Sequence, residues 1–111
     1  MESKTALSQL SALAQENRLA VFRLLVKAGH DGLPAGDIAA ALGVPPNTLS
    51  SQLNILSNAG LIEGNRQGRS IIYTANYDAI SGLIVFLMED CCQGREEVCS
   101  PIMAAAQSAC C

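Results

Sequence analysis

The segment from Gly43 to Tyr73 constrains the fold of this chain more than any other. Leu49, Leu53 and Leu56 recur at helical spacing, so a helix over residues 47–58 turns this stripe toward a core. Uncharged hydrogen-bonding groups form the opposite face of that helix and its flanks: Asn47, Thr48, Ser50, Ser51, Gln52, Asn54 and Asn58. Such groups can read base edges in a major groove, so the pattern predicts a DNA-reading helix.

The residues before this helix predict its partner in a helix-turn-helix. A short helix is expected over residues 37–42, and Gly43 ends it. The turn then passes through residues 44–46, where proline is tolerated in the first turn of the next helix.

The residues after it predict a β-hairpin wing. Strands are expected at residues 61–63 and 70–74, joined by a turn-rich tip at residues 64–68. Arg66 and Arg69 lie at this tip, so we expect them to contact DNA phosphates or the minor groove.

Helices are predicted on both sides of this segment. Apolar spacing indicates one helix over residues 7–14 and a second over residues 17–28, ended by Gly29, with residues 30–34 as a loop. A long helix is expected from Tyr77 to about residue 90. It is apolar around most of its circumference and too short to span a bilayer, which favours a buried helix or a subunit interface.

Composition fits one domain but argues, at first sight, against nucleic acid. The chain has 111 residues, is 50% hydrophobic, and carries a net charge of −3. The distribution of charge matters more than the sum, because residues 43–75 contain only Glu63, Arg66 and Arg69 as charged groups. A local cationic edge on an acidic protein is therefore expected.

All five cysteines follow Asp90, at positions 91, 92, 99, 110 and 111. Thiolates are ligands for soft ions, and three of them can surround one ion. A disulfide staple suits small secreted domains, whereas this chain opens with Met1-Glu2-Ser3-Lys4 and no signal-type apolar run, so we expect a cytoplasmic protein. The odd count and the two vicinal pairs also fit a simple staple poorly.

The run from Pro46 to Ile62, followed by Arg66-Gln67-Gly68-Arg69 and Ile72-Tyr73, resembles the recognition helix and wing of the ArsR/SmtB winged-helix metalloregulators. The resemblance covers about residues 5–90. It implies a homodimer that pairs through its first and last helices and represses an operator until an inducer ion binds. One departure is Ser51, where many members carry a basic residue.

The metal sites of this family vary in position, and most of them lack ligands here. Residues 36–42 contain no cysteine and residues 77–90 contain no histidine, which excludes the third-helix thiol site and the last-helix Asp/His site. The tail instead resembles a subgroup of arsenite-responsive members, through Cys91, Cys92 and Cys99. Arsenite and antimonite prefer three thiolates, in keeping with that resemblance. A set of Cys99, Cys110 and Cys111, or a site shared across the dimer, stays open.

Together these features predict a mainly α protein with a β-hairpin wing: four helices, two strands and a fifth helix. Residues 1–90 form the winged helix-turn-helix and dimerisation domain, and residues 91–111 a cysteine-rich metalloid-binding tail. We expect a non-enzymatic repressor with operator DNA and a second copy as partners, trivalent arsenic or antimony as inducer, and no membrane or organic cofactor. The expected DNA contacts are Asn47, Thr48, Ser50, Ser51, Gln52, Asn54, Arg66 and Arg69.

Other functions remain open on the sequence. The tail thiols would also suit a redox switch on the same scaffold or a cadmium or zinc sensor. A metallochaperone or thiol enzyme that does not bind DNA is a further alternative, although the acidic residues beside the cysteines favour the protonated thiol and so disfavour a nucleophile.

Overall fold

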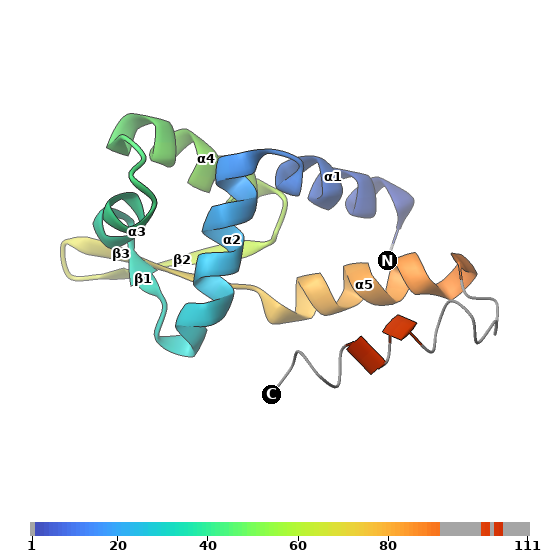
Figure 1. Ribbon diagram of the computed structural model, residues 1–111. Helices are drawn as coiled ribbons and strands as arrows, with labels where there is room; N and C mark the ends of the chain where they lie inside the picture. The colour runs from blue at the N-terminus through green and yellow to red at the C-terminus, as the bar shows by residue number, and fades with distance from the viewer. Residues whose placement is uncertain (1, 92–100, 103, 106–111) are drawn as a thin grey trace.

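Helices dominate the structure, and a small antiparallel sheet lies at one end of them (Figure 1). The computed structural model describes residues 2–91, 101–102 and 104–105. Within residues 2–91 the elements are α1 (Ser3–Leu13), α2 (Glu16–Ala28), a 3-10 turn η1 (Gly29–Asp31), β1 (Leu33–Pro34), α3 (Ala35–Leu42), α4 (Pro46–Asn58), β2 (Ile62–Gln67), β3 (Ser70–Ala75) and α5 (Tyr77–Cys91). This order confirms the predicted winged helix-turn-helix.

Local signals in the sequence set most helix boundaries. Gln15 caps α2, because its Oε1 accepts a hydrogen bond from the Arg18 backbone N–H at 2.9 Å. Gly29, with φ of 72°, ends the same helix. The Arg18 side chain caps the C-terminal end of α1, because its Nε donates a hydrogen bond to the Ala12 carbonyl oxygen at 2.6 Å.

The core lies where α2, α3 and α4 meet the base of the hairpin. The predicted leucine stripe of α4 is buried in it. The buried residues of the core are Ala12, Val21, Phe22, Leu25, Ile38, Val44, Leu49, Leu53, Leu56, Leu61, Ile62 and Ala75. Burial of this many large apolar side chains holds the helix-turn-helix and the hairpin in one rigid unit.

The sheet differs from the prediction in two ways. Strand β2 continues to Gln67 and pairs with Ser70, so residues 64–67, predicted as part of the tip, belong to the strand. Leu33 and Pro34, predicted as loop, form a third strand that pairs with Tyr73 and Ile72 and gives the order β1-β3-β2. Gly32 permits this approach, since a Cβ there would overlap the Tyr73 carbonyl oxygen.

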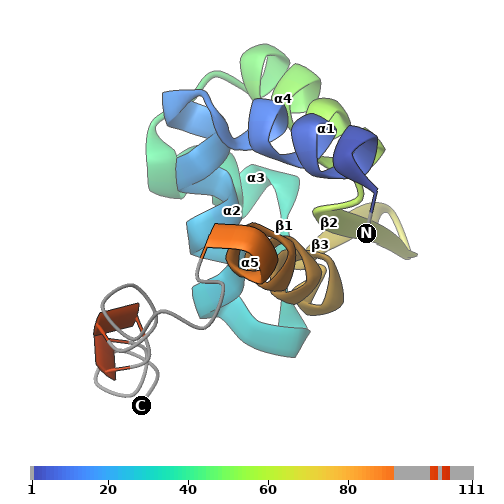
Figure 2. The ribbon, with the colours of Figure 1, turned by 90° about the vertical axis from the view of Figure 1, so that its right-hand side faces the viewer.

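Helix α5 leaves the sheet and runs beside α1 (Figures 1 and 2). The side chain of Leu83 is buried, whereas Ile84, Val85 and Leu87 are 50, 56 and 42% exposed. Leu7 and Leu10 of α1 are also exposed, at 66 and 38%. The two neighbouring helices therefore present apolar side chains that the described part of this protomer leaves exposed. In the described part of the chain, no helix has the length and apolarity needed to cross a membrane.

Candidate nucleic-acid interface

The helix-turn-helix is built from α3, a three-residue turn and α4. Gly43 ends α3 in the left-handed region, with φ of 64° and ψ of 33°. The Val44 N–H then donates to the Ala39 carbonyl oxygen at 3.1 Å. Pro46 opens α4, at a position where no backbone N–H is needed for a helical hydrogen bond. Glycine and proline at these two positions thus fix the angle between the helices locally.

The polar face predicted for α4 exists. Six of the expected polar side chains are exposed, namely Asn47, Thr48, Ser50, Ser51, Asn54 and Asn58, and α4 carries no charged residue. Each can donate or accept hydrogen bonds without a charge that must be neutralised. The helix therefore presents a surface suited to base edges rather than a generic solvated face.

Gln52 departs from the prediction. Its side chain is only 8% exposed, and its Oε1 has no hydrogen-bond partner within the described residues. Gln52 lies on the flank of the leucine stripe, three residues after Leu49 and four before Leu56, and the elements packed against α4 cover this flank as well. We therefore remove Gln52 from the expected DNA-contacting set.

The wing is the β2–β3 hairpin, with Ile62 paired with Ala75 at its base and Gln67 with Ser70 at its tip. Only Gly68 and Arg69 lie between the strands. Gly68 has φ of 64°, a conformation that glycine adopts at the first position of a type II′ turn. Arg66 and Arg69 are both exposed, as predicted for cations that contact a DNA backbone.

Gly64 sets the packing of the wing. A Cβ at this position would lie 3.0 Å from both Ile71 Cγ2 and Tyr73 Cε1, closer than ordinary contact. Without that Cβ, the side chains of β3 lean across β2 and stay near the helix-turn-helix. Sequence reasoning assigned Gly64 only to a turn, because the need for close approach depends on the partner strand.

Asn76 connects the start of α5 to the end of the recognition segment, and the sequence analysis missed it. Its Nδ2 donates to the Gly60 carbonyl oxygen at 3.0 Å, and its backbone N–H donates to the Leu61 carbonyl oxygen at 2.8 Å. Its Oδ1 accepts from the Ala79 N–H at 3.2 Å, which caps α5. Asparagine immediately before an apolar helical run was the available signal.

We expect Asn76→Ala to lower the free energy of unfolding by about 1–2 kcal/mol, because both the cap and the bond to Gly60 are lost. Urea denaturation of the variant beside Asn54→Ala, which alters an exposed residue of α4, measures the effect. Equal stability of the two variants would contradict the structural role of Asn76.

The predicted metal ligands fall almost entirely outside the described residues. Cys92, Cys99, Cys110 and Cys111 lie outside them, and Cys91 is the last residue of α5, where only its backbone is described. Among the described side chains, no three His, Cys, Asp or Glu groups gather closely enough to hold a metal ion. The ligand set therefore stays a prediction.

Comparison with known proteins agrees with this geometry. A family model described as a helix-turn-helix domain matches residues 13–65. The transcriptional regulator NmtR of Mycobacterium tuberculosis is 42% identical over 67 residues, which are 60% of this chain and 53% of NmtR, so the match spans about half of that relative.

Solved structures extend the likeness over more of the chain. An ArsR-like transcriptional regulator from Rhodococcus sp. RHA1 has a TM-score of 0.69 at 25% identity, covering 96% of this chain and 93% of that one. The homodimeric winged helix-turn-helix DNA-binding domain of Mb0332 from Mycobacterium bovis, a possible ArsR-family regulator, has a TM-score of 0.65 at 26% identity, covering 77% of each chain.

The fold, the polar helix face and the wing define a protein of the winged helix-turn-helix class, the class to which its DNA-binding structural neighbours belong. Within that class, the chain is similar in sequence and fold to ArsR-like transcriptional regulators.

Proposed function

We propose that this protein binds double-stranded operator DNA in the cytoplasm as a homodimer, represses transcription, and is released when trivalent arsenic or antimony binds the tail cysteines. The observation that carries the DNA-binding part is the exposed, uncharged face of α4 beside the two wing arginines. Asn47, Ser50, Ser51 and Asn54 would contact base edges, and Arg66 and Arg69 would hold the phosphate backbone.

The dimer part is supported by the apolar surface of α1 and α5. Leu7, Ile84 and Val85 are each at least half exposed on helices that lie side by side. Clusters of exposed apolar side chains are typical of subunit interfaces. A two-fold pair would present two copies of α4 to successive major grooves, about 34 Å apart on B-form DNA.

Coupling between the tail and α4 would run through α5. Cys91 is the last residue of α5, and Asn76 precedes its first residue and bonds to Gly60, just after α4. A tail closed around an ion would shift α5, and that shift would reach the recognition helix through the interface and Asn76. Only about 1.4 kcal/mol of coupling is needed for a tenfold loss of operator affinity.

The metalloid assignment is tested by selectivity. A three-thiolate site satisfies trivalent arsenic or antimony and leaves zinc one ligand short, so we expect release of operator at micromolar arsenite or antimonite and no release by zinc. A mobility-shift titration of the full chain, with zinc and cadmium as matched ions, measures this. X-ray absorption of the arsenic-bound protein should give three sulfur neighbours.

Other results would change the assignment of the inducer but not the assignment of the fold. Release by zinc at equal concentration, or a shell of four sulfurs, would favour a soft-metal sensor. Release by diamide together with no response to arsenite would favour a thiol redox switch.

A further inference from the structure

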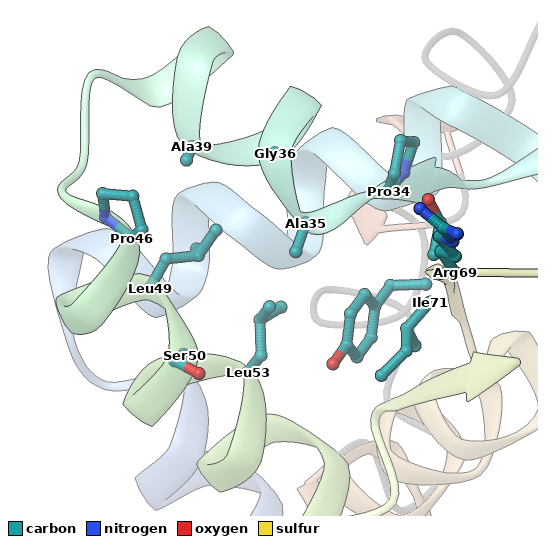
Figure 3. A pocket seen from close by; sticks show the side chains of 12 residues that line it. Pro34, Ala35, Gly36, Ala39, Pro46, Leu49, Ser50, Leu53, Arg69 and Ile71 are labelled. Carbon is teal, nitrogen blue, oxygen red and sulfur yellow. The ribbon is translucent and has the colours of Figure 1, made fainter. Parts of the chain in front are cut away.

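A cavity lies between the helix-turn-helix and the wing, and the repressor function leaves it unassigned. Its volume is about 380 Å³, within the range of sites that bind small molecules. Helices α3 and α4 form one side and β3 the other (Figure 3). The lining residues that carry the argument are Ala35, Leu53, Ile71, Tyr73, Ser50 and Arg69.

The body of the cavity is apolar and exists because α3 carries small residues there. Ala35, Gly36 and Ala39 face the space, while the larger side chains of Leu49 and Leu53 form its floor from α4 (Figure 3). Ile71 lies on the opposite wall and is 43% exposed. Pro34 and Pro46 also line the cavity, and their fixed φ angles restrict the backbone at these two positions. An apolar group of small size would be desolvated on several sides in this space.

The polar side chains that line the cavity are those of Ser50, Arg69, Ser70 and Tyr73, and Arg69 alone among these lining residues carries a charge, which is positive. Arg69 lines it, and within the described residues its guanidinium takes part in no hydrogen bond or ion pair that would satisfy it. Ser50 and Ser70 line the same space with hydroxyl groups. No Asp or Glu is among the lining residues. An occupant with an apolar body and one negative group is therefore favoured over a neutral or cationic one.

We propose that this cavity is a second effector site that binds a small monocarboxylate with an apolar body, such as an aromatic acid or a medium-chain fatty acid. The apolar body lies between Ala35, Leu53 and Ile71, and the carboxylate pairs with the fork of donors on Arg69. Because Ser50 and Arg69 also belong to the proposed DNA-contacting surface, bound acid and bound operator exclude each other. The site acts without the tail cysteines.

The direct test is a titration of the reduced full-length protein, followed by amide chemical shifts. We use benzoate and octanoate, with benzamide as a neutral control of similar shape. Shifts should concentrate at Ala35, Ala39, Leu53 and Ser70, and benzamide should bind at least about tenfold more weakly than benzoate, a ratio that corresponds to one charge-assisted pair. Benzoate has an aromatic ring and octanoate an alkyl chain, so their relative affinities decide between an aromatic and an aliphatic ligand.

Two variants on α3 separate cavity binding from general effects. Ala35→Leu fills the space and should abolish the shifts, whereas Ala40→Leu adds the same side chain at an exposed position that does not line the cavity and should keep them. Both are expected to retain operator affinity. Arg69→Gln should bind benzoate and benzamide equally, which keeps the proposal testable if Ala35→Leu fails to fold.

Competition links the site to regulation. Benzoate or octanoate should displace a labelled operator from wild-type protein and from Cys99→Ser protein at the same concentration, because the site does not use the tail. The proposal would be overturned if benzamide bound as tightly as benzoate, or if the Ala35→Leu protein bound benzoate as the wild type does. It would also be overturned if about 10 mM benzoate or octanoate caused no amide chemical-shift change. These results are independent of whether arsenite releases DNA.

Discussion

Replacement of Cys99 with serine is expected to leave operator affinity unchanged and to abolish release by arsenite. Cys99 belongs to both predicted ligand sets, with Cys91 and Cys92 or with Cys110 and Cys111. A serine hydroxyl is a poor ligand for a soft ion, so two thiolates would remain where three are needed. Operator binding should persist because the residues proposed to contact DNA lie at least thirty positions earlier in the chain. A mobility-shift titration with arsenite measures both quantities.

The control for this experiment is the double variant Cys110→Ser/Cys111→Ser. If Cys91 and Cys92 complete the site, the double variant responds like the wild type; if the terminal pair completes it, the double variant fails as Cys99→Ser does. Release of the Cys99→Ser protein at the wild-type arsenite concentration would show that the tail site has been assigned to the wrong residues.

The second large effect is expected for the wing. Replacing Arg66 and Arg69 with alanine should weaken binding to specific and nonspecific DNA together, because phosphate contacts carry little sequence information. Loss of four phosphate contacts per dimer should make the negative slope of log K against log salt shallower by about 3.6 and reduce affinity on the order of 100-fold at moderate salt. Fluorescence anisotropy over a salt series gives both values.

Arg23→Ala provides the control, because Arg23 is also exposed but lies on α2, outside the helix-turn-helix and the wing. Its salt slope should equal that of the wild type. If the double variant keeps the wild-type slope, the cationic surface that meets DNA lies elsewhere on the protein.

Short-range signals in the sequence determined the helix-turn-helix formed by α3 and α4. The stripe of Leu49, Leu53 and Leu56 fixed the inward face of α4, and Gly43 and Pro46 fixed where the two helices end and begin. These signals work because helical periodicity and backbone restriction act within one or two turns. The order of helices and hairpin, and the exposed polar face, were therefore predictable from the residues alone.

Several features of the candidate site depended on residues distant in the chain. Gln52 was expected on the flank of α4, yet its side chain is buried, since how wide a stripe is covered depends on the elements packed against the helix. Strand β1 exists only because Gly32 lets the chain approach Tyr73, about forty residues later.

Contacts across the fold also decided two features on which the proposals rest, the hydrogen bond of Asn76 and the cavity beside the wing. Asn76 joins α5 to Gly60 by a side-chain hydrogen bond that no local pattern encodes. The cavity arises where small residues of α3 lie opposite Ile71 and Tyr73 of the wing. The sequence alone determined which helix presents an uncharged polar face, because that follows from the spacing of side chains along one element. Tertiary structure alone decided what surrounds that helix, because the space between elements depends on all of their side chains at once.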